Sequence, residues 1–380
     1  MAKVMSVNAG SSSLKFKLFE MPSQEEIVSG NIEQIGLEES KINIKKNGEK
    51  KVHHLVLKNH TEAVNILLKL LIEEKIVTTL NEIDAVGHRV VHGGEQFAES
   101  VIIDEKVEQV IENLSMLAPL HNPANLTGYR AFKKALPDVK QVAVFDTAFH
   151  QTMPIESYLY PIPYEYYEEF KIRRYGFHGT SHLYVSNRAI ELLGNPKESK
   201  IITCHLGNGA SLSAVKNGKC IQTSMGFTPL AGVMMGTRSG DIDPAIVTYL
   251  AEQLNVSSDD VINILNKKSG LLGVSGVSSD ARDVLQATKE GNKRAIVARK
   301  IQVQTVAERI GSYYALLGGC DAIVFTAGLG ENDGEFRAEV IEMIEDAFDV
   351  HIKEESVSLR AKEELISTQN SKIKVYVIPT

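Results

Sequence analysis

Two strand–turn–strand stretches with similar turns lie about half a chain apart, and they limit the folds open to this sequence. In the first, VNAGSSSLKFKLF (7–19), apolar residues alternate with lysines after the turn, as in a strand with one buried face. The second lies within SKIITCHLGNGASLSAVKNGKCIQTS (199–224), and placing Ser13 over Ser211 aligns NAGSSSL with LGNGASL. The pattern predicts a duplicated domain in which each copy presents a phosphate-facing hairpin turn. Chance similarity between two hairpins is the alternative.

Length and composition agree with a two-domain globular protein. A chain of 380 residues is long for one domain, and we predict an N-terminal domain over 1–150 and a C-terminal nucleotide-binding domain over 151–380. The hydrophobic share of 43% and charged share of 23% are those of soluble proteins. A net charge of −7 argues against nucleic acid and anionic membranes as partners, and no apolar run reaches the length of a spanning helix.

The chain start and the cysteines point to the cytoplasm. MAKVMSVNAG leads directly into a strand pattern, without the layout of a signal peptide. The three cysteines are Cys204, Cys220 and Cys320, and their spacing is not that of a metal site. An odd, sparse set of cysteines suits a reducing compartment.

Strand and helix patterns alternate along the chain, which favours an α/β fold. We predict strands at 3–8, 14–19, 83–91, 141–150 (running into a polar loop), 322–326 and 372–380, besides those within 199–224. We predict helices at about 61–76, 105–117, 123–135, 244–254, 258–267 and 292–317.

The first turn, NAGSSS, has the chemistry of an anion site. Successive backbone N–H groups in a glycine-containing turn form a nest for anions, and serine hydroxyls add donors. Lys15 supplies positive charge just beyond the turn. The pattern is not that of a P-loop. A polar surface turn is the structural alternative, above all for Ser12.

Three further motifs of the first half place polar groups in apolar surroundings. GHRVVHGG sets Arg89 in an apolar strand, where a guanidinium is costly unless it meets an anion. That anion is a ligand, or else an Asp or Glu of the chain. PLHNPAN places His121 at a helix entry, as a ligand group or as an ordinary loop residue. VFDTAFH puts Asp146 at the end of a buried strand, where ligands of open α/β sheets gather, or where it caps the next turn.

The second half carries four glycine-containing polar segments. RRYGFHGTSH gathers Arg173, Arg174, His178 and His182 around two glycines, and MGFTPLAGVMMGTRSGDIDP is a long loop that carries Arg238. GVSSDARDV and FTAGLGEN are predicted as turns that present backbone donors. Together these corners favour a nucleotide cleft and phosphoryl transfer, in which catalysis is mostly positioning and charge neutralisation. The residues by themselves leave the phosphoryl acceptor open.

The ordered set of motifs resembles the acetate kinase family over essentially the whole chain. The motifs are NAGSSSLKF, GHRVVHGG, LAPLHNP, VFDTAFH, YGFHGTSH, HLGNGASL, TPLAGVMMGTRSGDIDP and FTAGLGEN. The resemblance implies two related ribonuclease-H-like α/β domains of the actin and sugar-kinase superfamily around a nucleotide cleft. It also implies reversible transfer of the ATP γ-phosphoryl group to acetate with Mg²⁺ (Mn²⁺ in its place is possible), in a cytoplasmic homodimer.

The resemblance assigns catalytic and substrate roles to particular positions. Arg89 matches the arginine that holds the substrate carboxylate, Asp146 the active-site carboxylate, and His178 and Arg238 the groups that stabilise the transition state. The residues that match the small pocket for the acyl methyl group are Val91, Leu120 and Pro229.

Metal and nucleotide roles follow in the same way. Asn8 matches the magnesium-site asparagine and Lys15 a nucleotide-binding lysine. The remaining matches to nucleotide segments are His205, Leu206, Gly207, Asn208, Gly209, Asp280, Ala281, Arg282, Gly328, Leu329, Gly330, Glu331 and Asn332. Family members continue past the last strand with an acidic magnesium residue and a final helix, whereas the sequence above ends at Thr380.

Three other functions are compatible with parts of this pattern. A propionate or butyrate kinase differs only in the acyl pocket, where the branched Val91 should crowd a longer chain. A non-catalytic nucleotide-binding protein of the actin type would not need Arg89, His178 and Arg238. An acyl-phosphate hydrolase would need a positioned water in place of a carboxylate pocket.

Overall fold

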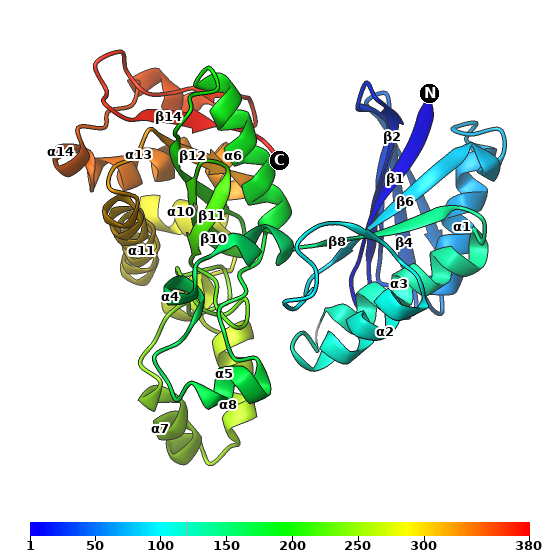
Figure 1. Ribbon diagram of the computed structural model, residues 1–380, viewed down its shortest axis with the longest axis horizontal. Helices are drawn as coiled ribbons and strands as arrows, with labels where there is room; N and C mark the ends of the chain where they lie inside the picture. The colour runs from blue at the N-terminus through cyan, green and yellow to red at the C-terminus, as the bar shows by residue number, and fades with distance from the viewer. Residues whose placement is uncertain (120) are drawn as a thin grey trace. The chain divides into compact units, whose positions relative to one another are not determined.

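The computed structural model describes residues 1–119 and 121–380, and the chain divides into two compact units, Met1–Ala148 and Phe149–Thr380. Each unit is built on its own β-sheet (Figure 1). We call them unit 1 and unit 2 and describe them separately.

Unit 1 is a mixed eight-stranded sheet in the order β5-β4-β3-β2-β1-β6-β8-β7. Its strands are β1 (Ala2–Ala9), β2 (Leu14–Met21), β3 (Glu25–Glu33), β4 (Ser40–Lys46), β5 (Glu49–Leu55), β6 (Ile83–Val90), β7 (Val101–Ile102) and β8 (Lys140–Phe145). Its helices are α1 (His60–Glu73), α2 (Glu105–Asn113) and α3 (Asn122–Ala135). Strands β1 to β5 pair antiparallel, whereas β6 pairs parallel with both β1 and β8.

The core of unit 1 lies between the sheet and helices α1 and α3 (Figure 1). The alternation predicted for β2 puts Leu14, Phe16 and Leu18 into this core, while Lys15 and Lys17 are exposed. Helix α1 adds a leucine-rich stripe, and Phe132 of α3 is fully buried. The polar groups at the ends of β1 and β6 are thereby attached to a rigid base.

Unit 2 is a six-stranded sheet in the order β11-β10-β9-β12-β14-β13. Its strands are β9 (Lys200–Leu206), β10 (Ala210–Lys216), β11 (Lys219–Thr223), β12 (Ala322–Thr326), β13 (Glu364–Leu365) and β14 (Lys374–Val377). Its helices are α4 (Ile155–Tyr158), α5 (Glu165–Phe170), α6 (Gly179–Leu192), α7 (Ala245–Leu254), α8 (Ser258–Lys267), α9 (Gly270–Ser275), α10 (Ala281–Lys289), α11 (Lys293–Leu317), α12 (Ala327–Asn332), α13 (Gly334–Glu342) and α14 (Glu345–Phe348).

The sheet of unit 2 packs against helices on both faces, because α6 contacts β9 and β12 while α11 contacts β9 and β10 (Figure 1). The six residues of β10 before Lys216 and all five of β12 are accordingly buried. Residues of β9 alternate between the two layers, and Thr203 on the α6 side bonds to His182 of that helix.

The two sheets share one strand order, which confirms the duplication predicted from the two turns. In each, three antiparallel strands (β3-β2-β1 and β11-β10-β9) are followed by two parallel ones (β6-β8 and β12-β14). An antiparallel edge strand, β7 or β13, completes each sheet. The fold is α/β with two related domains.

Several local predictions need correction. Strands β3, β4 and β5 follow β2 directly and were not predicted, and neither was helix α6, which begins inside RRYGFHGTSH. The segment AGLGEN is not a turn but the short helix α12. The closing strand is shorter than predicted: it begins at Lys374 and ends at Val377, although Ile378 N still donates to Phe325 O of β12 at 3.1 Å.

Candidate active site

A small cavity of about 230 Å³ lies at the ends of the central strands of unit 1. Four of the predicted site residues, Asn8, Lys15, Arg89 and Val91, line it, and so does His121. The remaining lining residues are Ala9, Gly10, Ser13 and Asn125. Leu120, predicted for the same acyl pocket, lies outside the described residues.

The turn between β1 and β2 is held from several directions. Within it, Gly10 N donates to Ser13 O at 2.8 Å, and from outside, Ile35 N donates to Ser12 O at 2.9 Å. His60, the first residue of α1, has its Nε2 2.8 Å from Gly10 O. The turn that carries the serines is therefore a fixed part of the unit.

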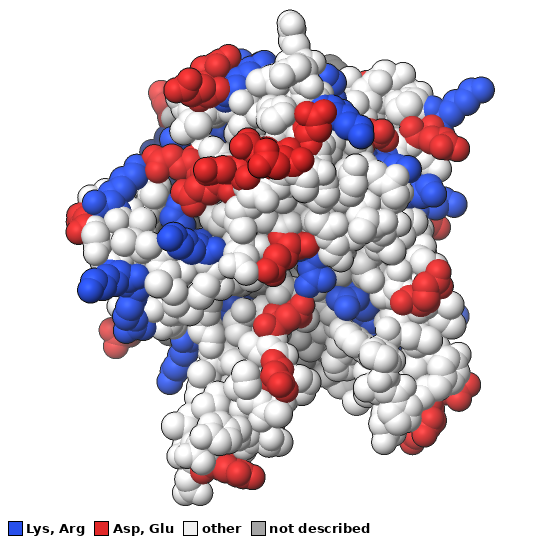
Figure 2. All heavy atoms as spheres, turned by 90° about the vertical axis from the view of Figure 1, so that its left-hand side faces the viewer, with Lys and Arg blue, Asp and Glu red and all other residues white. Residues whose placement is uncertain are grey.

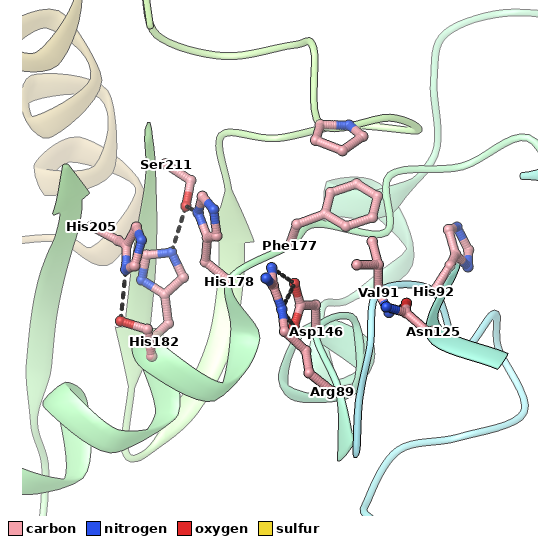
Figure 3. Close-up of polar contacts among 12 residues, drawn as sticks. Arg89, Val91, His92, Asn125, Asp146, Phe177, His178, His182, His205 and Ser211 are labelled. Atoms are coloured by element: carbon pink, nitrogen blue, oxygen red, sulfur yellow. Dashed lines mark hydrogen bonds and ion pairs between the residues drawn. The ribbon is translucent and has the colours of Figure 1, made fainter. Parts of the chain in front are cut away.

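Two buried asparagines of α3 tie the strand ends together, and the sequence reasoning missed both. Asn125 accepts from Val91 N at 3.1 Å and donates to Ala9 O at 2.9 Å, which links β6 to β1 (Figure 3). Asn122 accepts from His92 N and donates to His92 O, both at 3.0 Å. The available sign in the sequence was the spacing of Asn122 and Asn125, which are three residues apart at the start of a predicted helix and therefore lie on one face of it.

Arg89 meets Asp146 in a two-point ion pair (Figure 3). Nε of Arg89 lies 2.9 Å from Oδ1, and Nη2 lies 2.5 Å from Oδ2. The Asp146 side chain is 4% exposed and that of Arg89 is 40% exposed. The charge of Asp146 raises the pKa of Arg89. Arg89 therefore pairs with an acidic residue of the chain, which was one of the two alternatives. Among the described residues, however, its Nη1 has no hydrogen-bond acceptor and is available to an anion.

In unit 2, His178 stands at the start of α6 in a left-handed conformation, with φ of 58°. A non-glycine residue in this region is strained, and such residues concentrate at functional sites. Its Nδ1 lies 2.8 Å from Ser211 Oγ, and its ring stacks on His205 with centroids 4.1 Å apart (Figure 3). His205 Nδ1 lies 2.8 Å from Ser181 Oγ.

Arg238 comes to the same place from the glycine-rich loop. A Cβ atom on Gly209 would lie 3.4 Å from Arg238 Nη1 and 3.7 Å from His178 Nε2, so both side chains pack over this glycine. Arg238 Nη1 donates to Pro229 O at 3.2 Å. The structure therefore brings His178, Arg238, Gly209 and Pro229 together, as a group able to bind an anion.

The two arginines of RRYGFHGTSH, Arg173 and Arg174, contact other groups of the protein. The guanidinium of Arg173 lies 3.8 Å above the ring of Tyr158. Arg174 Nη1 donates to the carbonyls of Thr223, Ser224 and Met225, each at 3.2 Å. These contacts fix the loop that leads to His178. Of the residues of this motif, His178 therefore remains the candidate for binding an anion.

A second cavity, of about 670 Å³, lies in unit 2 among helices α9 to α13. Eight predicted nucleotide residues line it: Gly207, Asn208, Asp280, Ala281, Arg282, Gly328, Leu329 and Asn332. Asp280 caps α10 by accepting from Arg282 N at 2.9 Å, and it also pairs with the Arg282 guanidinium. Most of the predicted nucleotide segments therefore meet in one hollow.

Five of the predicted nucleotide residues of unit 2 do not line this cavity. Leu206 and Gly330 are buried in the packing, and His205 and Gly209 belong to the His178 group. Glu331 is turned inward, and its Oε1 accepts from Thr380 N at 3.1 Å. Lys15 belongs to the cavity of unit 1.

The larger cavity also contains residues that sequence reasoning missed. Gly236 allows the Asn208 side chain to lie against its backbone, because a Cβ atom on residue 236 would lie 1.7 Å from Asn208 Oδ1. Gln302 of α11 is 3% exposed and lines the cavity, and among residues 1–119 and 121–380 its amide has no hydrogen-bond partner. The apolar lining beside it comes from Leu271, Leu285 and Leu329. A buried polar group beside an apolar slot is the usual arrangement for recognising a flat heterocycle.

No group of three or more His, Cys, Asp or Glu side chains able to hold a metal ion occurs in the part of the chain that the structure describes. Mg²⁺ is commonly held by one or two protein oxygens together with substrate phosphates and water. Asn8 offers an amide oxygen of the required type at the small cavity, whereas the carboxylate of Asp146 is 4% exposed and both its oxygens pair with Arg89.

Comparison with known proteins places the chain in a family. The sequence model of the acetokinase family matches residues 3–380. The acetate kinases of Bacillus subtilis (strain 168) and Geobacillus kaustophilus (strain HTA426) are each 55% identical to it, over all of this chain and 96% of theirs.

Solved structures agree with this placement. The acetate kinase of Porphyromonas gingivalis superposes with a TM-score of 0.95 at 46% identity, and a propionate kinase from Francisella tularensis subsp. tularensis SCHU S4 with 0.94 at 41%. Each match covers all of this chain and 96% of the other. Fold and sites thus define a two-domain kinase. The chain belongs to the acetokinase family.

Proposed function

We propose that this member of the acetokinase family transfers the γ-phosphoryl group of ATP to acetate, reversibly, giving acetyl phosphate and ADP. Full-length similarity to acetate kinases supports the reaction. The observation in this chain that carries the proposal is the presence of two cavities, a small one in unit 1 containing Arg89 and Val91 and a larger one in unit 2 lined by eight nucleotide-segment residues.

In the proposed acetate site, Arg89 binds the carboxylate and Val91 contacts the methyl group. Asp146 holds Nε and Nη2 of Arg89, which leaves Nη1 to the substrate. Val91 is 4% exposed and lines the same cavity. Pro229 and Leu120 complete the acyl pocket by resemblance. At about 230 Å³, this cavity is smaller than the usual pocket for a drug-sized ligand.

The proposed chemical step is direct in-line attack of acetate on the γ-phosphorus. A carboxylic acid has a pKa of about 4, so acetate is ionised at neutral pH and needs no general base. What it needs is relief from repulsion by an anionic phosphate. Arg89 neutralises the nucleophile, and Arg238 neutralises the equatorial phosphoryl oxygens, to which His178 donates a hydrogen bond in the transition state. Asp146 is assigned a positioning and metal-site role.

ATP binds the second cavity with its phosphates toward the glycine-containing turns. Lys15 and the turn residues around Asn8 are the proposed phosphate contacts of unit 1. Asn8 and Asp146 would hold Mg²⁺, directly or through water, and the metal when bound neutralises phosphate charge; Mn²⁺ could replace it.

One assay tests the proposal. The protein is incubated with ATP and Mg²⁺ and with acetate, propionate or butyrate, and acyl phosphate is trapped with hydroxylamine. We expect hydroxamate chiefly with acetate. No hydroxamate with any acid would rule out a kinase, and ATP hydrolysis without acid would favour a hydrolase.

Propionate is the second candidate substrate, because a propionate kinase is 41% identical to this chain over its whole length. One methylene in an apolar pocket changes selectivity by only about 1–3 kcal/mol. The branched Val91 in the small cavity favours acetate.

We infer a homodimer that acts in the cytoplasm on acetate and ATP, with neither nucleic acid nor membrane as a partner. Exposed apolar side chains on α5, α7 and α8, among them Phe170, Tyr249 and Ile262, support self-association. The sparse free cysteines suit a reducing compartment. Basic and acidic side chains are intermingled on the face shown in Figure 2. Light scattering coupled to gel filtration measures the oligomeric state.

No helix of the described residues combines the length and apolar character that a membrane crossing requires.

A further inference from the structure

A serine hydroxyl connects two histidines at the start of α6. Ser211 Oγ, on β10, lies 2.8 Å from Nδ1 of His178 and 2.8 Å from Nε2 of His182 (Figure 3). Ser211 and His182 are fully buried, whereas His178 is partly exposed. One hydroxyl has a single proton, so it can donate to only one of these two rings.

The far end of the chain of hydrogen bonds decides which ring receives that proton. Thr203 Oγ1 donates to the carbonyl of Ser213 at 3.4 Å, and a carbonyl can only accept. Both contacts of Thr203 Oγ1 are hydrogen bonds only when it donates to Ser213 O and accepts from Nδ1 of His182, 2.7 Å away, and this fully bonded arrangement places the ring proton of His182 on Nδ1. Burial keeps this ring neutral by lowering the pKa of His182 well below its usual value.

The proton positions of Ser211 and His178 follow from that of His182. With its proton on Nδ1, neutral His182 offers only a lone pair at Nε2, and the Ser211 hydroxyl donates to it. The Ser211 oxygen is then an acceptor for Nδ1–H of His178. Neutral His178 in this state has an unprotonated Nε2, the atom near Gly209 and Arg238.

We propose that Ser211 and His182 are positioning residues that fix a proton on Nδ1 of His178, so that its Nε2 donates to the phosphoryl group only in the doubly protonated ring. The proposal deepens the proposed kinase function and rests on it. In this arrangement Nε2 of neutral His178 is an acceptor, and it becomes a donor only after the ring takes up a second proton.

The charged and titratable neighbours of His178 in unit 2 set when this uptake occurs. Among the described residues of unit 2 they include His182 on its own helix, the stacked ring of His205 on β9, and Arg238 on the glycine-rich loop. Arg238 disfavours a second positive charge nearby, whereas a phosphate between the two favours it. His178 therefore gains its second proton when a phosphoryl group arrives.

The proton position can be measured without reference to activity. Protein labelled with ¹⁵N in histidine side chains is studied by NMR across neutral and mildly alkaline pH, and His178 is assigned from the signals lost in His178→Gln. We expect neutral His178 to carry its proton on Nδ1. A neutral ring protonated on Nε2 would overturn the proposal, even in an active enzyme.

Kinetics supply the second test. Ser211→Ala should lower kcat by about tenfold to a hundredfold, the usual effect of removing a group that orients an active residue, with little change in KM for ATP or acetate. Ser211→Thr keeps the hydroxyl and should restore most of kcat. Ser186→Ala, which removes another buried hydroxyl of unit 2, bonded to Leu183 O, should match the wild type.

The pH profile separates positioning from a merely structural role. In the wild type, kcat should fall as pH rises through ionisation of His178. In Ser211→Ala the neutral ring can place its proton on Nε2, so this alkaline fall should become shallower. Equal pH profiles in Ser211→Ala and wild type, or equal kcat, would contradict the proposal. If the wild type forms no acyl phosphate, the kinase function fails, and the NMR measurement still decides the proton position.

Discussion

Arg89 and Asp146, 57 residues apart in the sequence, form a two-point ion pair in which the carboxylate is buried and the guanidinium is partly exposed. Asp146 thereby orients Arg89 through Nε and Nη2, and Nη1 is the group that we propose donates to a substrate anion. The pair explains how an arginine is tolerated in the apolar strand β6. Replacing either residue would leave the charge of the other without its partner.

Replacing Arg89 tests this arrangement. Arg89→Ala should lower turnover by about a thousandfold, because the carboxylate of acetate loses its counter-charge. It should also lower the free energy of unfolding by about 3 kcal/mol, since Asp146 is left buried without a partner. Turnover in the hydroxamate assay and denaturant unfolding measure the two effects. Arg130→Ala removes an exposed arginine of the same unit, paired with Glu108, and should change neither appreciably.

Arg238 is expected to act on the phosphoryl group. Arg238→Ala should reduce kcat by about a thousandfold, with a smaller effect on KM for acetate, because the charge that it neutralises develops in the transition state. Steady-state kinetics with each substrate varied distinguish the two parameters. The control is Arg188→Ala, an arginine of unit 2 paired with Glu363 at its surface. Near-normal kcat in Arg238→Ala would refute the assignment.

Val91 should set the size of the acid. Val91→Ala enlarges the small cavity, so the ratio of kcat/KM for propionate to that for acetate should rise by about tenfold, within the range expected for one methylene. The measurement is kcat/KM for both acids under saturating ATP. An unchanged ratio would mean that other residues limit the acyl chain.

Gln302 should recognise the nucleotide base. An amide can donate to and accept from adenine, so Gln302→Leu should raise KM for ATP by about tenfold to a hundredfold and reduce the preference for ATP over ITP. KM for acetate should stay the same. Gln304→Leu, on the same helix but bonded to Glu308 at the surface, is the matched control. Equal ATP and ITP preference in Gln302→Leu and wild type would exclude base recognition by this residue.

Unit 1 should lose stability in mild acid. Burial lowers the pKa of His88 to about 4 and that of His92 to about 4, below the value near 6.5 of the unfolded chain. The unfolded state therefore binds protons first, and stability present above pH 6.5 is lost as pH falls toward 4, by about 3 kcal/mol for each histidine. Denaturant unfolding at several pH values gives the slope. His88→Gln should flatten it, and an equally steep slope in that variant would contradict the prediction.

Much of the fold could be predicted from local pattern. The alternation of Leu14 and Phe16 with lysines predicted β2, and the apolar run AIVFT predicted β12 with the bounds observed. Strand β5 could not be found in this way, because it is mostly exposed and polar and, within the described residues, its only partner strand is β4. Helix α6 was obscured by the glycines and histidines at its start.

Some residues of the candidate site could likewise be predicted from the sequence, and others could not. Glycine and serine turns after strands indicated anion-binding corners, and eight nucleotide residues chosen through the family resemblance line one cavity. Gln302 was missed because a glutamine inside a long helix has no local sign of function. The asparagines of α3 were missed because their partners, Val91 N and Ala9 O, belong to distant strands.

Local sequence specified the chemical groups and the two similar turns that present them, because these depend on residues close together in the chain. Tertiary contacts established that Asp146 orients Arg89, that Ser211 lies between His178 and His182, and that Gln302 reaches a cavity. These contacts depend on which strands and helices become neighbours, and that is set by burial of the apolar faces of the two sheets, not by spacing along the chain.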